Sequence, residues 1–68
     1  MFYKIYTLNK GWIYINYTQI QYIEDSPIKI PESDEPAYRI RMATSENIYI
    51  NLENYKWLYG KLKNIWKI

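Results

Sequence analysis

The residues Ile-Tyr-Ile-Asn occur twice in this chain of 68 residues, as Ile13–Asn16 and again as Ile48–Asn51. In both copies isoleucine alternates with a polar or aromatic residue, which is typical of a strand with one buried face. When the chain is aligned with itself at this spacing, "YKIYTLNKGWIYIN" from Tyr3 lies over "YRIRMATSENIYIN" from Tyr38. Each copy therefore predicts one β-hairpin. The repeat arose either by duplication or by chance in a chain rich in Ile and Tyr.

Turn-forming residues separate the two arms of each predicted hairpin. The first turn is "NKG", which ends at Gly11, and the second is "TSEN". A further strand is expected at Ile20–Glu24, because β-branched and aromatic residues favour strands. The alternation places one set of side chains in the core: Ile13, Ile15, Tyr38, Ile40, Met42, Ile48 and Ile50. It places another set on the outward faces: Trp12, Tyr14, Arg39, Arg41 and Tyr49.

Residues 25–36 differ in composition from the rest of the chain. They contain all three prolines and most of the acidic residues. Proline has no N–H to donate to a strand ladder, so we expect an acidic loop here, in which Ile28 and Ile30 could form a short edge.

The last part of the chain, residues 51–68, has the pattern of an amphipathic helix. Asn51 is a good N-cap residue, and Glu53 lies in the first turn, where a negative charge is favourable. One apolar arc is formed by Leu52, Tyr55, Leu58, Tyr59, Leu62, Ile65 and Trp66. The chain is therefore predicted to be a single α+β domain. Residues 1–24 form a hairpin and a connecting strand, residues 37–50 form the second hairpin, and this small antiparallel sheet packs against one C-terminal α-helix.

This order of elements resembles two known families. "YTLNKGWIYINYTQIQYIED", followed by an extended segment, "ENIYIN" and a helix, is similar to the small FlbD-like β-meander proteins of bacteria and to the first half of LytTR-type DNA-binding domains. The resemblance covers most of the chain and implies a meander closed by a helix.

The composition argues against an enzyme. There is no Cys and no His, so disulfides and zinc sites of the Cys/His kind are excluded, and acid–base work would fall to carboxylates, Lys or Tyr. The sequence contains no Gly-rich phosphate loop and no nucleophile motif. The acidic residues of the Pro-containing segment lack the spacing of a calcium loop, and a solvated loop is the preferred interpretation. We expect no catalytic residue, no bound metal and no cofactor.

Three groups of residues are candidates for binding a partner. Trp57 lies opposite the apolar arc. Either it is a binding hot spot, or the helix rotates or bends at Gly60, or the acidic loop covers the indole. A basic stripe, Lys56, Lys63 and Lys67, either contacts phosphates or an acidic surface, or is a solvated face that complements the helix dipole. The outward residues Trp12, Tyr14 and Tyr49, with Arg39 and Arg41, either stack bases and hold phosphates or pack across strands.

We therefore expect a small non-catalytic regulator or inhibitor that binds and occludes a larger host protein. Richness in Ile, Tyr, Lys and Asn, which have AT-rich codons, suggests a low-GC bacterium or its phage, and hence a location in the bacterial cytoplasm. The alternative is a nucleic-acid-binding module that uses the basic helix or the Tyr/Arg sheet face. A homo-dimer is compatible with either function, because exposed strand edges favour self-association. No apolar run is long enough to suggest a membrane span, and "MFYKIYTLNK" lacks the features of a signal peptide.

Overall fold

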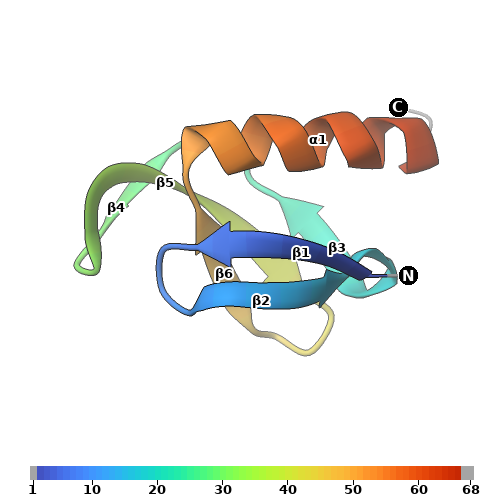
Figure 1. The fold of residues 1–68 in the computed structure, drawn as a ribbon, viewed down its shortest axis with the longest axis horizontal. Helices are drawn as coiled ribbons and strands as arrows, with labels where there is room; N and C mark the ends of the chain where they lie inside the picture. The colour runs from blue at the N-terminus through green and yellow to red at the C-terminus, as the bar shows by residue number, and fades with distance from the viewer. Residues whose placement is uncertain (1, 67–68) are drawn as a thin grey trace.

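The computed structural model describes residues 2–66, with side chains through residue 65 (Figure 1). Six strands and a short 3-10 helix precede one α-helix. The elements are β1 (Phe2–Thr7), β2 (Gly11–Asn16), η1 (Tyr17–Gln19), β3 (Ile20–Ile23), β4 (Ile28–Ile30), β5 (Ser33–Met42), β6 (Asn47–Ile50) and α1 (Leu52–Trp66). The fold is the expected small α+β fold, with antiparallel strands and one C-terminal helix.

The strands form a two-stranded sheet and a four-stranded sheet. β1 and β2 pair only with each other among the described residues. In the second sheet the long strand β5 lies in the middle, with β6 along one side and both β3 and β4 along the other. β3 and β4 thus act as one interrupted strand: Ile23 pairs with Ile40, and Ile28 pairs with Ala37 farther along β5.

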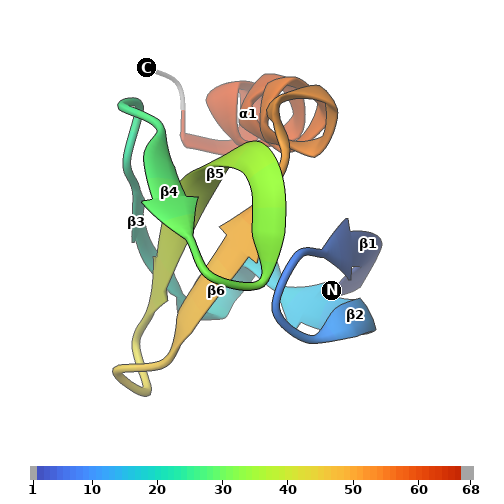
Figure 2. The same cartoon turned by 90° about the vertical axis from the view of Figure 1, so that its left-hand side faces the viewer.

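The turn of the first hairpin attaches the small sheet to β6. The backbone N–H of Leu8 donates to the carbonyl of Tyr49 at 2.7 Å. The side chain of Asn9 accepts from the N–H of Tyr49 at 3.2 Å and donates to the carbonyl of Asn47 at 3.3 Å. The two sheets therefore meet at β1 and β6, and Figure 2 shows α1, seen nearly end-on, above them.

The core lies between the two sheets and under the helix. Its buried members come from both sheets and from α1: Ile5, Ile15, Ile20, Tyr38, Ile40, Met42, Ile48, Ile50, Leu58 and Leu62. Ile13, which was also expected here, is partly buried against this cluster. The other inward positions predicted from the alternation are confirmed, because the isoleucines of both repeats face one common core.

The helix begins as expected but buries a narrower stripe than predicted. The side chain of Asn51 caps it by accepting from the N–H of Asn54 at 2.9 Å. Leu58 and Leu62 are fully buried, while Tyr55 is half-buried and stacks on Tyr38 with 4.3 Å between the ring centroids. Burial raises the pKa of the Tyr55 hydroxyl. The rest of the predicted arc with described side chains is exposed: Leu52, Tyr59 and Ile65.

The acidic segment contains more strand than the expected loop. Residues 25–36 include all of β4 and the first four residues of β5, Ser33–Pro36. The short edge at Ile28 and Ile30 is present. Strand β5 tolerates Pro36 because the register with β4 shifts between Ile28 and Ile30, so a missing N–H there breaks no regular ladder.

Candidate protein-binding surface

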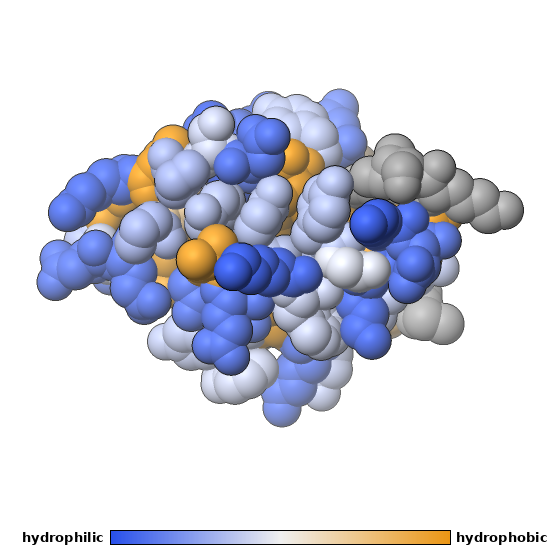
Figure 3. Space-filling view, turned by 90° about the horizontal axis from the view of Figure 1, so that it is seen from above, coloured by the Kyte–Doolittle hydropathy of each residue, from blue (hydrophilic) through white to orange (hydrophobic). Residues whose placement is uncertain are grey.

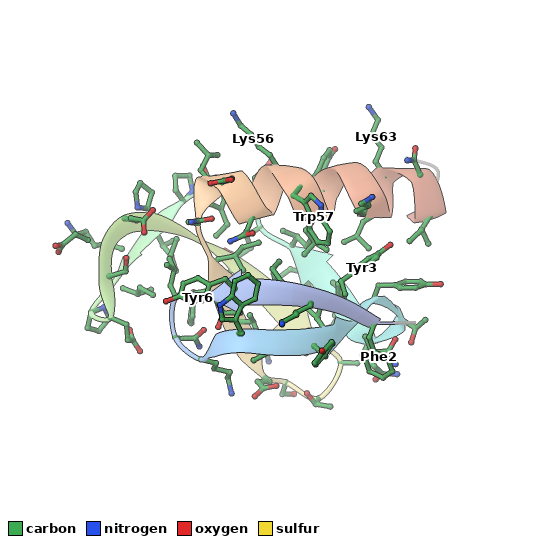
Figure 4. The ribbon with its side chains drawn as sticks, viewed as in Figure 1. Phe2, Tyr3, Tyr6, Lys56, Trp57 and Lys63 are labelled. Carbon is green, nitrogen blue, oxygen red and sulfur yellow. The ribbon has the colours of Figure 1, made fainter. Side chains whose placement is uncertain are left out.

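The outer face of the β1–β2 hairpin carries four exposed aromatic side chains. In the register of the hairpin Lys4 lies opposite Tyr14, and Tyr6 lies opposite Trp12, so Lys4 and these three aromatic side chains lie on the same face. Phe2 lies on this face too, because side chains along β1 alternate between its two faces. We call the four aromatic residues on this side of the hairpin the aromatic face: Phe2, Tyr6, Trp12 and Tyr14. Their exposed fractions run from 43% at Tyr6 to 70% at Tyr14. Figure 4 shows Phe2 and Tyr6 on the side of β1 away from the core.

The core and the turn fix which side chains point outward. Ile5, Thr7 and Ile15 alternate with the aromatic residues and are buried. The Thr7 hydroxyl donates to the carbonyl of Gly11 at 2.7 Å and accepts from the N–H of Lys10 at 3.0 Å, so the one buried polar side chain described is satisfied. Gly11 has a φ of 70°, which a glycine adopts without strain and which closes this three-residue loop. Buried side chains and the turn therefore fix the register of the hairpin, and this register places the aromatic face outward.

Neighbouring side chains restrain the aromatic face. The rings of Tyr6 and Trp12 meet edge-on, with 5.4 Å between their centroids. The Lys4 ammonium lies over the Trp12 ring, 5.4 Å from its centroid. Trp12 is thus positioned although it is 64% exposed. A partner that covers it gains apolar contact area while little side-chain freedom is lost.

Trp57 is neither buried nor fully turned outward. It is 42% exposed, and its ring meets that of Tyr3 on β1 edge-on at 5.4 Å between centroids. The Lys61 ammonium lies 5.8 Å from the Trp57 centroid. Leu58, a member of the predicted arc, is buried and Trp57 is exposed, but the indole also contacts Tyr3 at the border of the helix's buried side. Figure 4 shows Trp57 on the same side of the molecule as Tyr6.

The basic stripe of the helix lies away from the aromatic face. Figure 4 shows Lys56 and Lys63 pointing away from the sheets, and both are exposed. Figure 3, which looks down on α1, shows a surface that is mostly hydrophilic, with scattered apolar spots. Lys67, the third predicted member, is outside the described residues.

The structure does not bring the predicted Tyr/Arg face and the hairpin aromatics onto one surface. Arg39, Arg41 and Tyr49 lie on the outer side of β5 and β6, since they alternate with residues of the core. Trp12 and Tyr14 alternate with Ile15, which enters the same core from the opposite sheet. The two outer faces therefore look away from each other.

Arg39 is already engaged in its own sheet. It donates from Nε to Glu24 at 2.7 Å and from a terminal nitrogen to the other carboxylate oxygen at 3.0 Å. These hydrogen bonds hold the pKa of Glu24 below its ordinary value and raise the pKa of Arg39. Arg41 donates to the side-chain oxygen of Asn47 at 3.2 Å. Neither arginine has its full set of donors available to a phosphate.

Three members of the site were missed in the sequence. Phe2, Lys4 and Tyr6 belong to the same face as Trp12 and Tyr14, and the register of the first hairpin identifies them. Counting back from Gly11 across the turn would have paired Tyr6 with Trp12. This signal was present in the sequence, because the Gly at the end of "NKG" fixes where the second strand begins.

Metal-binding clusters, pockets and membrane-spanning helices are absent from residues 2–66. No three acidic side chains in this range lie close enough together to hold a metal ion. Its surface contains no pocket. The single helix in this range is too short and too polar to cross a membrane.

The β1–β2 hairpin thus carries more exposed aromatic side chains than any other hairpin or helix in the described part of the structure. A scan against models of protein families, a search of curated proteins and a search of solved structures each found no significant match to this chain.

Proposed function

We propose that this protein is a small non-catalytic regulator or inhibitor that binds a larger host protein and occludes the surface it covers. The observation that carries the proposal is the aromatic face, in which four aromatic side chains are exposed on one side of a single hairpin. We propose further that the protein is encoded by a phage and acts in the cytoplasm of its bacterial host.

The chemistry of this face suits a protein partner. Tyr and Trp are the residues most enriched among those that dominate binding energy, and they are most effective when a partner excludes water from them. A contiguous apolar patch rimmed by polar groups is typical of an interaction site. Lys4 lies within the face, and Lys61 lies beside Trp57. The matching surface is therefore expected to be apolar at its centre with acidic groups at its rim.

The experiment compares matched variants in host lysate. A tagged chain is used to purify its partner, and the same experiment is repeated with Trp12→Ala and with Tyr22→Ala. Trp12 belongs to the aromatic face, whereas Tyr22 is 45% exposed on β3, in the other sheet.

The proposal expects Trp12→Ala to lose the partner that wild type and Tyr22→Ala retain. Truncating a dominant aromatic residue costs about 2 kcal/mol or more, which weakens binding by about 30-fold. A partner that binds Trp12→Ala as tightly as wild type contradicts the assignment of this face.

A second candidate function is binding of single-stranded nucleic acid. It is favoured by one observation: among the described side chains, a lysine ammonium lies next to each exposed tryptophan, Lys4 over Trp12 and Lys61 over Trp57. Bases could stack on the rings while the lysines neutralise phosphates. This function predicts binding that weakens steeply with salt, measured by fluorescence anisotropy with single- and double-stranded probes. No change in anisotropy at low salt eliminates it.

A further inference from the structure

One edge of the small sheet has backbone groups directed into solvent. The carbonyl of Tyr6 accepts from the side chain of Asn54 at 3.2 Å, on the helix side of β1, and so points away from β2. In an antiparallel ladder, a residue whose backbone groups point away from the neighbouring strand lies opposite a residue whose N–H and C=O groups also point away from the ladder. The partner of Tyr6 is Trp12. The N–H and C=O groups of Trp12, and at the same period those of Tyr14 and Asn16, therefore point away from β1.

No strand of the described chain pairs with these groups, although the carbonyl of Asn16 accepts the first hydrogen bond of η1 as its N-cap. Within residues 2–66, β1 is the one strand that pairs with β2. In Figure 2 β2 lies at the margin of the molecule, away from α1 and from β3 and β4. The side chains of Trp12 and Tyr14 along this edge are also among the most exposed apolar groups of the protein.

β2 also lacks the features by which proteins protect a free edge. Natural edge strands are interrupted by charged residues, prolines or bulges that discourage pairing with another chain. β2 reads Gly-Trp-Ile-Tyr-Ile-Asn, with no charge and no proline, and its register with β1 is continuous. An unprotected edge of this kind is suited to the addition of a strand.

We infer that β2 pairs with β2 of a second copy of this chain, antiparallel, about a two-fold axis at Tyr14. This register places Tyr14 opposite Tyr14 of the second copy and Trp12 opposite Asn16. Tyr14 exchanges both N–H···O bonds with its copy, and in each flanking pair the N–H of Asn16 donates to the carbonyl of Trp12, while the carbonyl of Asn16 serves as the N-cap of η1. The two hairpins become one four-stranded sheet in the order β1, β2, β2, β1.

Two observations on charge favour a second copy over an unrelated strand. The segment carries no charge, so self-pairing brings no like charges together. The nearest lysine beyond the strand, Lys10, is already paired with Glu46. A two-stranded sheet is marginal by itself, whereas a four-stranded one is not. The alternation also keeps Trp12 and Tyr14 of both copies on one continuous aromatic surface. The dimer does not depend on the proposed host partner.

The test is a charge exchange at the two-fold axis. Wild type is expected to sediment as a dimer. Tyr14→Lys and Tyr14→Glu, each alone, should raise the dissociation constant by about ten-fold or more, because the axis places residue 14 opposite its own copy. Mixing the two variants in equal amounts should restore a dimer. Tyr22→Lys, an equally drastic change at an exposed tyrosine of the other sheet, should leave the dimer as in wild type.

A cysteine variant gives an independent result if the charged variants do not fold. The chain has no cysteine, so Tyr14→Cys introduces a single thiol. Facing residues in this geometry have their Cα atoms about 5.5 Å apart, within the range of a disulfide. Tyr14→Cys should therefore form an intermolecular disulfide faster than Tyr22→Cys. A wild type that sediments as a monomer, equal rates of disulfide formation, or charged variants that fold but do not recover a dimer on mixing would each overturn the inference.

Discussion

Two strand edges in residues 2–66 are built in opposite ways. The edge formed by β3 and β4 is interrupted between Ile23 and Ile28, shifts register twice against β5, and contains Pro27 and Lys29. The edge formed by β2 is continuous and uncharged. Within the described residues, neither β3 nor β4 pairs with a strand other than β5.

The difference indicates which edge is protected against pairing with a strand of another chain. Breaking a strand with proline and charge lowers its ability to pair and also weakens the sheet that contains it. That cost is present along β3 and β4 and absent along β2. An unprotected edge in a protein that protects its other edge is best explained by a strand that covers it. The four predictions below test the two edges separately.

The largest change in the free energy of unfolding is expected from substitutions of core residues that lie beneath the two edges. Ile15 lies under the β2 edge, is 2% exposed and belongs to the main core cluster. Ile15→Ala should lower the free energy of unfolding by about 2–5 kcal/mol. A chain of this length has a total of about 3–10 kcal/mol, so the variant is expected to be partly unfolded at room temperature. Urea unfolding followed by circular dichroism measures the change.

The matched substitution under the other edge is Ile30→Ala. Ile30 on β4 is 7% exposed but lies outside the main cluster. Its loss should cost about 2 kcal/mol, at the lower end of the same range. Equal costs at the two positions would mean that the β4 arm is as firmly part of the core as the hairpin.

The second prediction concerns the turn that sets the register of the β2 edge. Gly11→Ala places a side chain at a φ of 70°, where an L-residue is strained, while the added Cβ meets no atom within 4 Å. The expected loss is about 1–2 kcal/mol in the free energy of unfolding, from backbone strain alone. Gly60→Ala is the control, because its Cβ also enters open space but in a helix, where the change should stabilise by up to about 1 kcal/mol. An equal loss of stability at both positions would contradict the role assigned to φ at Gly11, because the added Cβ meets open space in both variants.

The local pattern of the chain predicted most of the fold. The alternation of Ile with polar and aromatic residues identified the inward faces of β2, β5 and β6, and Asn51 identified the start of α1. These features depend on residues near one another in sequence, where the period of a strand and the chemistry of a cap apply directly. The full extent of β5 was not predicted, because the three prolines of residues 25–36 indicated a loop, whereas a shift in register accommodates Pro36 within the strand.

The candidate site depended on how separate elements meet, which local patterns do not determine. Trp12 and Tyr49 were both predicted to point outward, and both alternate with core residues, but they belong to sheets that face each other. Trp57 was placed by the helical period, yet its exposure depends on the rotation of α1 and on Tyr3 across the interface. Such contacts require the relative placement of two elements.

The third prediction removes the charge from the protected edge. Lys29→Tyr changes β4 from Ile-Lys-Ile to Ile-Tyr-Ile, the same three residues that stand in β2. Because position 29 is exposed, the free energy of unfolding should change by less than about 0.5 kcal/mol. Association should nevertheless increase, with species larger than those of wild type at high concentration, as measured by sedimentation velocity. Lys56→Tyr makes the same change of charge and side chain on α1, and it should sediment like wild type. If both variants associate equally, lost charge and not edge pairing is responsible.

The smallest change in stability is expected from a substitution at Glu24, where the edge formed by β3 and β4 is interrupted. Glu24 follows β3 directly, and Arg39 on β5 donates two hydrogen bonds to its carboxylate. These bonds hold the pKa of Glu24 below its ordinary value of 4.5 in the folded protein. The folded state then binds fewer protons than the unfolded state between the two pKa values, so the pair stabilises the fold above pH 4.5 and loses this contribution as the pH falls through the lower pKa.

Glu24→Gln should therefore be slightly less stable than wild type at neutral pH, and the difference should close on acidification. The effect is small because both side chains are half-exposed and water and salt screen the pair. Urea midpoints of the two proteins, measured from neutral pH down to below the folded pKa at low and high salt, provide the test. A difference that persists unchanged at the lowest pH would assign the loss to altered hydrogen-bond geometry. In that case the interruption between β3 and β4 is held by shape, and charge contributes to this edge only by discouraging another strand.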